Sequence, residues 1–160
     1  MIFLRLETEA DTPLRLAWRN NPLIYQGFYT QSRNNTIIGW DENKAWLASR
    51  NKDWRNFIIM LDESTKEIIY KARPIGIAQI GQLDHWSPEI GYLIDVGEWR
   101  KGYGKEAVRQ LLGWIKTYGR EYCHTTVLKT NVASIKLLES LGFAYMAEAR
   151  PEEIWMTKKL

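Results

Sequence analysis

The apolar positions of the chain follow two different periods, and each period predicts its own kind of element. Residues 2–7 alternate between apolar and polar side chains, which is typical of a half-buried strand. Residues 57–61 form an unbroken apolar run, typical of a strand that is buried on both faces. Residues 104–118 instead carry one apolar stripe at helical spacing, made of Ala107, Val108, Leu111, Leu112 and Ile115. Strands and helices therefore share the chain.

The other segments extend this mixed pattern to both ends. Helices are expected at residues 8–19, from Asp41 onward and at 131–141, and strands at 74–83, 89–95, 125–128, 143–148 and 153–157. Asn131 suits the first position of the helix at 131–141, and Gly142 suits its end. No repeat, low-complexity segment or linker interrupts the pattern. We expect one α/β domain over residues 1–160.

Composition and charge narrow the kinds of partner. The chain has 160 residues, 45% hydrophobic and 26% charged, which is ordinary for a globular protein that buries roughly 70% of its unfolded surface. The net charge is +3, and no long Lys/Arg run occurs. These values argue against a nucleic-acid partner and suit a small polyanionic ligand.

Cysteine and histidine usage argues against a metal centre and a structural disulfide. Cys123 is the only cysteine, and His85 and His124 are the only histidines. No intramolecular disulfide is possible, and we expect no metal site, a buried strand position for Cys123 and a reducing cytoplasmic location. No apolar run is long enough to predict a signal peptide or a membrane-spanning helix.

Two glycines and three cations stand at the start of the helix predicted at 104–118, in the stretch from Trp99 to Ala107. The first N–H groups of a helix lack partners, and its dipole adds positive potential there. Glycines let the backbone come close to a ligand. This loop is therefore a candidate cradle for a phosphate or pyrophosphate.

Two common phosphate-binding motifs do not fit this loop. A P-loop needs a Lys-Ser/Thr pair after its second glycine, and Tyr103 and Gly104 follow Gly102 instead. The dinucleotide string G-x-G-x-x-A is present at residues 102–107, but the acidic residue Glu121 precedes the next predicted strand rather than ending it. Too few strand–helix units follow for a dinucleotide-binding domain.

A third interpretation fits better. The strand at 89–95, the loop and the following helix resemble the acetyl-CoA-binding segment of the GNAT family of N-acetyltransferases, whose loop reads Arg/Gln-x-x-Gly-x-Gly/Ala. Trp99 stands at the first position, as in the branch with the ribosomal-protein-alanine acetyltransferases. Residues 131–143 resemble the family's later motif, Asn-x-x-Ser-x-x-x-Tyr/Leu-x-x-x-Gly-Phe. Trp18-Arg19-Asn20 and Trp46-Leu47 also look like this branch.

The resemblance implies a fold and a donor. The fold would be a mostly antiparallel sheet of six to seven strands with a splayed parallel pair and helices on both faces. The donor would be acetyl-CoA, without a metal, and the acetyl group would pass directly to a primary amine. The resemblance assigns acetyl-CoA binding to Tyr92, Ile94, Arg100, Lys101, Gly102, Tyr103, Gly104, Lys105 and Asn131.

Two residues are candidates for the chemistry. Glu89 opens the strand where the acceptor amine should arrive and is the candidate base or water relay, although it also fits an exposed carboxylate in a salt bridge. His85, in a predicted loop, is a weaker candidate. Many family members protonate the thiolate with a Tyr where this chain has Leu138. Ser134 is the candidate substitute, and it also fits an ordinary first-turn residue of a helix.

The resemblance places the acceptor against an aromatic segment of the N-terminal half. Arg19, Tyr25, Phe28 and Trp40 are candidate substrate-binding residues, with Tyr29 and Trp46 beside them, or most of these residues pack the first helices on the sheet. We expect Trp114 and Trp155 to pack rather than to recognise a ligand. An amino sugar, free or nucleotide-linked, is favoured over a protein N-terminus, and a non-catalytic acyl-CoA sensor is the third hypothesis. A homodimer is compatible with the family, and no residue fixes an interface.

Overall fold

A single open sheet organises the chain in the computed structural model, which describes residues 1–28, 31, 37–50 and 52–160. Its strand order is β1-β2-β3-β4-β5-β7-β6. Only β4 and β5 are parallel neighbours, and all other pairs are antiparallel. The strands are β1 (Ile2–Leu6), β2 (Arg55–Asp62), β3 (Ala72–Gly81), β4 (Glu89–Ile94), β5 (Tyr122–Leu128), β6 (Ala144–Arg150) and β7 (Glu153–Lys159).

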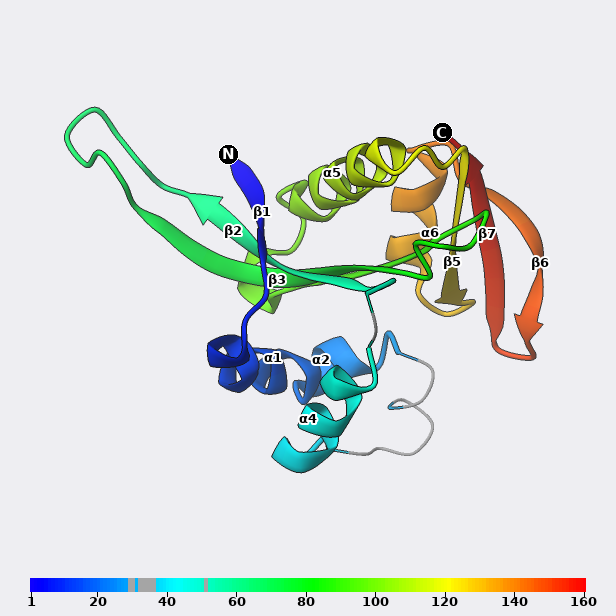
Figure 1. The fold of residues 1–160 in the computed structure, drawn as a ribbon, viewed down its shortest axis with the longest axis horizontal. Helices are drawn as coiled ribbons and strands as arrows, with labels where there is room; N and C mark the ends of the chain where they lie inside the picture. Colours follow the sequence, from blue (N-terminus) through cyan, green and yellow to red (C-terminus); the bar gives the residue numbers. More distant parts are fainter. Residues whose placement is uncertain (29–30, 32–36, 51) are drawn as a thin grey trace.

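Helices cover both faces of this sheet (Figure 1). The described helices are α1 (Thr12–Arg19), α2 (Pro22–Tyr25), α4 (Trp40–Ala48), α5 (Tyr103–Thr117) and α6 (Val132–Glu139), with short 3-10 turns at Glu9–Asp11 and Val96–Glu98. One apolar cluster lies beneath α5 and α6, and a second lies on the side of α1 and α2. The predicted architecture, including helices on both faces, is confirmed.

The internal strand β2 shows why the sequence has an unbroken apolar run. Phe57, Ile59 and Leu61 belong to the cluster beneath α5. Ile58 and Met60 belong to the cluster on the α1 side. Since successive strand residues point to opposite faces, a strand covered on both faces needs apolar side chains at every position.

Several predicted boundaries differ from those of the structure for local reasons. Gly39, not Asp41, is the N-cap of α4, and Asp41 lies in its first turn. The short helix α2 was not expected from the sequence; it begins at Pro22, since proline suits the first helical position. Asn21 caps α2 by accepting a hydrogen bond from the Leu23 N–H at 3.0 Å. β5 begins at Tyr122, three residues before the predicted start at Thr125.

The parallel strands β4 and β5 separate almost where they begin. They pair only at Glu89 and His124. The Asp95 N–H donates to the Ile75 carbonyl, so the backbone groups of the even-numbered β4 residues point toward β5. Thr125 Oγ1 donates to the Ile90 carbonyl at 2.9 Å. Tyr92 lies beyond this bond and has no β5 partner among the described residues, which confirms the expected splay.

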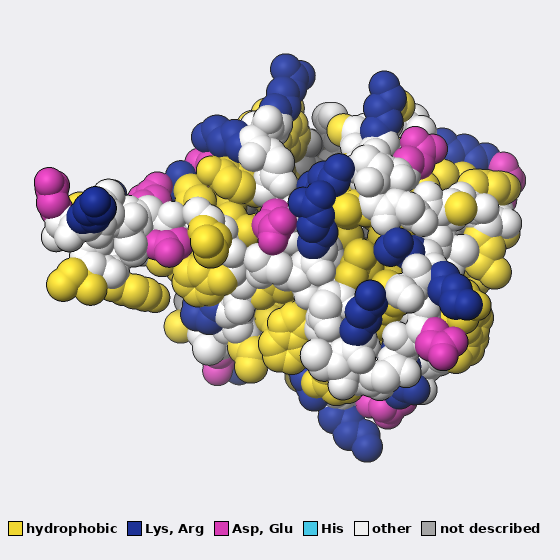
Figure 2. Space-filling model, turned by 90° about the horizontal axis from the view of Figure 1, so that it is seen from above, with side chains coloured by type: hydrophobic (Ala, Val, Ile, Leu, Met, Phe, Trp, Pro, Cys, Tyr) yellow, Lys and Arg dark blue, Asp and Glu magenta, His cyan; other side chains and the backbone are white. Residues whose placement is uncertain are grey.

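The hairpin that joins β2 and β3 projects past β1 (Figure 1). It carries hydrophobic side chains (Figure 2), among which Ile69 and Tyr70 are largely exposed. This arm joins the start of β3, whereas the other end of β3 pairs with Glu89 at Gly81. The point where β4 and β5 begin to separate therefore lies at the end of β3 away from the arm, and the splay opens from there toward Ile94, which pairs with Gly76. No helix in the described residues has the length and apolarity needed to cross a membrane.

Candidate active site

The glycine-rich loop ahead of α5 has the backbone shape of an anion cradle. Gly102 is the N-cap of α5 with φ +83°, and Arg100 also has a positive φ of 62°. A Cβ added at Gly102 would meet no atom within 4 Å, so the need for glycine comes from its backbone conformation. The first N–H groups of α5 lack helical partners, and the α5 face carries many Lys and Arg side chains (Figure 2). The loop fits a pyrophosphate.

The loop cations differ in their pairing. Lys101 Nζ lies 3.1 Å from Glu98, which also pairs with Arg73 at 2.8 Å. The bonds from Arg73 and then Lys101 lower the pKa of the Glu98 carboxyl. Arg100 and Lys105 have no ion pair in the part of the chain that the structure describes. These two are the better-placed counter-charges for a bound phosphate.

The backbone of β4 carries the two residues of this strand that were predicted to bind acetyl-CoA. Trp99 Nε1 donates to the Ile94 carbonyl at 2.8 Å, which gives the residue at the family's Arg/Gln position a structural task. That bond uses one lone pair of the Ile94 carbonyl. The backbone groups of Tyr92 point to the splay without a β5 partner among the described residues, so Tyr92 is the freer of the two predicted contacts.

Tyr92 and Ser134, which the sequence placed in different roles, are bonded to each other. Tyr92 Oη lies 2.9 Å from Ser134 Oγ. Burial raises the pKa of Tyr92, and the Ser134 bond opposes that shift. Asn131 Oδ1 accepts from the Ser134 N–H at 3.2 Å, so the predicted cap is confirmed. Leu138, at the family's Tyr position, is fully buried in the core.

Two glycines bring elements close together here. A Cβ at Gly104 would lie 3.2 Å from Leu137 and 3.5 Å from the Tyr92 ring, so glycine lets α5 approach both α6 and β4. A Cβ at Gly27 would lie 3.0 Å from Asn131 Nδ2. The segment after α2 therefore reaches the start of α6.

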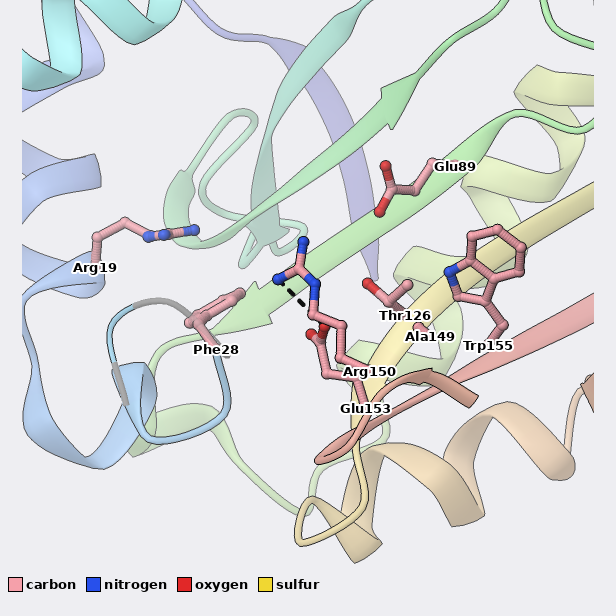
Figure 3. Close-up of a pocket in the computed structure, with 8 residues that line it drawn as sticks. All are labelled: Arg19, Phe28, Glu89, Thr126, Ala149, Arg150, Glu153 and Trp155. Carbon is pink, nitrogen blue, oxygen red and sulfur yellow. Dashed lines mark ion pairs between the residues drawn. The ribbon is translucent and has the colours of Figure 1, made fainter. Parts of the chain in front are cut away.

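A pocket of about 370 Å³ lies beside the splay (Figure 3). Arg19 and Phe28 approach it from one side and Glu89 from the other (Figure 3). The structure thus brings these three predicted residues together. The pocket is lined by Arg19, Phe28, Glu89, Thr126, Ala149, Arg150, Glu153 and Trp155.

The other acceptor candidates lie elsewhere. Tyr25 does not line the pocket, and Trp40 stands at the start of α4 with 50% of its surface exposed. Tyr29 lies outside the described residues. His85 is exposed in the β3–β4 loop and bonds to Ser87 rather than facing the pocket.

Two carboxylates line this pocket, and they differ in burial and in ion pairing. Glu89 is half-buried and makes no ion pair within the described residues, so the expected salt bridge is not found there. Glu153 is 8% exposed and lies 3.6 Å from Arg150. Burial raises the pKa of Glu153, Arg150 opposes the shift, and the charge of Glu89 adds to it. Glu89 is the carboxylate free to accept a proton from a bound amine.

Arg19 makes no ion pair within the described residues, although the charge of Glu42 acts on it from a distance. Its guanidinium stacks on Phe28 at 4.2 Å, and its Nε has no hydrogen-bond partner among the described residues. Burial, helped by the charge of Arg15, lowers the pKa of Arg19 to about 10. A buried cation without an acidic partner is unfavourable unless a ligand supplies one. The pocket is therefore suited to an acceptor with an anionic group.

Five lining residues were missed by the sequence interpretation. They come from β5, from β6 and from β7: Thr126, Ala149, Arg150, Glu153 and Trp155. Trp155 was expected to pack, but it is 41% exposed and lines the pocket, whereas Trp114 packs on Phe57 at 5.1 Å as expected. The pairing of Thr126 with Trp155 across β5 and β7 brings this wall together. The strand pattern at residues 153–157 was the sequence signal that could have pointed to this wall of the pocket.

Other reactive groups do not join the pocket. Cys123 is fully buried, as predicted, and burial raises its pKa to about 12, so it is not a nucleophile at neutral pH. Within the described ranges, no group of three or more His, Cys, Asp or Glu side chains is placed to hold a metal ion.

The family follows from a comparison with known sequences. Residues 1–144 match the family model for the acetyltransferase (GNAT) domain. The chain belongs to the GNAT acetyltransferase family. The open sheet with its single parallel pair is the GNAT fold, so the family and the fold expected from the sequence are both confirmed.

The relatives extend this comparison. An uncharacterized protein of Methanocaldococcus jannaschii is 39% identical over 157 residues, which are 95% of this chain and 30% of that protein. The chain thus spans under a third of that relative's length. A crystal structure of a domain from the same organism has a TM-score of 0.91 and 36% identity, and it covers 100% of this chain and 99% of that one. Spermidine N-acetyltransferase from Vibrio cholerae, in complex with CoA and spermine, has a TM-score of 0.79 and 16% identity, with 99% and 95% covered. The last comparison shows a shared GNAT fold.

Proposed function

We propose that this GNAT chain transfers an acetyl group from acetyl-CoA to the primary amine of an amino sugar, preferably one linked to a nucleotide. The observation that carries the proposal is the position of Glu89. Its free carboxylate faces the pocket, and its backbone pairs with β5 at the point where the splay begins. A base between the donor cleft and an acceptor pocket is the arrangement that acetyl transfer to an amine requires.

The donor side rests on backbone groups. The loop from Arg100 to Lys105 would hold the pyrophosphate, and Tyr92 in β4 would pair with the pantetheine arm as an added strand does. When bound, acetyl-CoA supplies an activated thioester. Holding that thioester against a bound amine supplies several kcal/mol of barrier reduction, on the order of the proximity effects seen in intramolecular reactions.

The role of Glu89 would be to remove a proton from the acceptor amine. A lysine-like amine has a pKa near ~10.4 and an α-amine one near ~8, so at neutral pH most of either amine is protonated. Glu89, directly or through one water, would take that proton. Glu153 is less suited because it pairs with Arg150.

The acceptor side favours a sugar that carries an anionic group. Phe28 and Trp155 offer aromatic faces to a ring, and Arg19 offers an unpaired guanidinium to a phosphate. A protein N-terminus is the second candidate, since it too presents a primary amine, and the replacement of the family's Tyr by Leu138 keeps a non-catalytic acyl-CoA sensor as the third.

An assay of thiol release tests these candidates against one another. The purified chain is mixed with acetyl-CoA and one amine at a time: a nucleotide-linked amino sugar, a free amino sugar, an N-terminal peptide and spermidine. We expect the fastest release with the nucleotide-linked sugar and the slowest with spermidine. Release with the peptide alone would favour the second candidate. Binding of acetyl-CoA without release to any amine would favour a sensor.

A further inference from the structure

We propose that Arg50 and Arg19 together bind the diphosphate group of a nucleotide-linked amino sugar. This assignment rests on the proposed function and deepens it, because it names the side chains that would distinguish such an acceptor from a free amino sugar. Arg50 follows α4 and is not among the residues that line the pocket. What makes it a ligand-binding residue is the way in which the fold holds its guanidinium beside Glu89.

Two tryptophans fix the guanidinium of Arg50. Its Cζ lies 4.1 Å from the ring centroid of Trp46 in α4 and 3.6 Å from that of Trp54, which directly precedes β2. A guanidinium that packs over aromatic rings uses its faces for that contact and leaves the N–H donors at its edge available to an anion. The two rings therefore orient Arg50 without using its hydrogen-bond donors.

Trp54 places this group next to Glu89. A Cβ added at Gly81 would lie 2.5 Å from the Trp54 side chain, so the Trp54 ring covers the backbone of β3 at that glycine. Gly81 pairs directly with Glu89 across β3 and β4, and directly paired residues share a face of the sheet. Burial lowers the pKa of Arg50, and the charge of Glu89 opposes this shift. Arg50 therefore lies close enough to the candidate base for their charges to interact.

Arg50 nevertheless stays unpaired beside this carboxylate. In the part of the chain that the structure describes, Arg50 makes no ion pair, and its Nε is buried without a hydrogen-bond partner. A buried polar group without a partner is unfavourable, and a ligand that brings acceptor oxygens would relieve that cost. The side chain as a whole is only partly buried, so a ligand can reach it.

Arg19 supplies the second charge. It lines the pocket together with Glu89, and its Nε also has no hydrogen-bond partner among the described residues. The charge of Arg15 acts on both Arg19 and Arg50, but Arg15 itself is neutralised by Glu7, with Nε 2.6 Å from Oε1. Of these three neighbouring arginines, one is paired inside the fold and two are not. Two unpaired guanidinium groups match the two negative charges of a diphosphate linkage.

Binding of inorganic pyrophosphate tests the site apart from turnover. CoA is first added at a saturating concentration, so that the donor side is occupied, and calorimetry then measures the Kd of pyrophosphate. Arg50→Met keeps the bulk between the two tryptophans and removes the charge, and we expect it to raise this Kd about 10-fold. The wild-type Kd should also depend more steeply on salt. Arg109→Met is the matched control, because Arg109 is exposed on α5 and pairs with Glu106.

Turnover supplies the second readout. In Arg50→Met, kcat/KM for a nucleotide-linked amino sugar should fall about 10-fold, whereas that for a free amino sugar should stay within about 2-fold. The KM for acetyl-CoA should not change. Arg50→Lys should lose only about 3-fold with the nucleotide-linked sugar, because it keeps the charge but not the planar set of donors.

The outcomes separate this site from the function on which it rests. Equal losses with the two acceptors in Arg50→Met, or a wild-type chain that does not bind pyrophosphate once CoA is bound, would overturn the site and leave acetyl transfer intact. Pyrophosphate binding that depends on Arg50 in a chain that acetylates no amine would uphold the site and overturn the proposed function. A thermal melt shows whether Arg50→Met weakens the fold, and in that case Arg50→Lys decides by the same comparison of acceptors.

Discussion

The proposed donor half of the site is built from backbone, whereas the proposed acceptor half is built from side chains. The donor half comprises the loop at residues 99–105, the splayed edge of β4 and the start of α6. Its anion cradle depends on the positive φ of Gly102 and on unpaired helix N–H groups. The acceptor half is the pocket around Glu89, to which segments far apart in the sequence each give one or a few side chains.

This difference teaches how the two halves tolerate change. A backbone cradle works for one ligand and is altered only by a residue that cannot adopt its conformation. A pocket of side chains changes its ligand preference when the side chains that line it change. We therefore expect substitutions in the two halves to have separable effects, on acetyl-CoA in one case and on the acceptor in the other.

The largest effect is expected for Glu89→Gln. Removal of a general base lowers the rate of thiol release by about 100-fold or more. The loss should be greatest at low pH and should shrink as the pH rises toward the pKa of the amine, which then loses its proton without help. Binding of acetyl-CoA should not change. Glu148→Gln, on the exposed strand β6, is the matched control. A pH–rate profile identical to that of the wild-type chain would exclude Glu89 as the base.

The next effect is expected for Arg19→Met, which keeps the bulk of the side chain and removes its charge. The kcat/KM for an anionic acceptor should fall by about 10- to 100-fold, as expected for loss of a charge-assisted bond. Since the guanidinium is largely buried and makes no ion pair among the described residues, the free energy of unfolding should hold or rise by up to about 1 kcal/mol. Acceptor kinetics and urea unfolding measure the two quantities. Loss of stability with unchanged kinetics would show that Arg19 only packs.

A smaller effect is expected for Gly102→Ala in the donor half. At φ +83° the added Cβ strains the backbone by about 1 kcal/mol, so acetyl-CoA should bind roughly 5-fold more weakly. Gly113→Ala is the matched control, because Gly113 lies inside α5 with open space around it and a helical φ. That control should raise the free energy of unfolding by about 0.5–1 kcal/mol. Equal acetyl-CoA affinity in wild type and Gly102→Ala would contradict the cradle.

The smallest effect is expected outside both halves, at Asp11. Two bonds from Arg5 hold the pKa of the Asp11 carboxyl at about 2, below the ordinary value of 3.8. Because the folded pKa is depressed, this pair stabilises the fold above about pH 4 and its contribution disappears as the pH falls toward 2. Asp11→Asn should flatten that part of the stability curve. Since Arg5 is 39% exposed, the loss at neutral pH should stay below about 1 kcal/mol. Urea unfolding at several pH values measures it, and turnover should not change.

The sequence predicted the local structure of the proposed donor half, because that structure depends on local rules. The cap at Asn131 and the apolar stripe of α5 each act within a few residues. The splay followed from the family resemblance. What the sequence missed was the bond from Tyr92 to Ser134, because it joins β4 to α6 across 42 positions.

The acceptor half was predicted only in part, because its side chains meet through strand pairing between segments that are far apart in the sequence. Arg19, Phe28 and Glu89 were found, but Glu153 and Trp155 join them only through the pairing of β5 with β7. The position of Trp40 on the surface could not be read from its hydrophobicity, since an aromatic residue suits both a pocket and a helix start. Residues that meet through strand order alone carry no local signal.

A bisubstrate analogue tests most directly whether the two halves meet at Glu89. In this compound an acetyl linker joins the CoA sulfur to the amine of a nucleotide-linked amino sugar, and calorimetry compares its affinity with that of CoA. We predict that the wild-type chain binds the analogue at least about 100-fold more tightly than CoA, and that Arg19→Met loses most of this gain while its affinity for CoA is unchanged. Equal affinity of the wild-type chain for the analogue and for CoA would contradict the account.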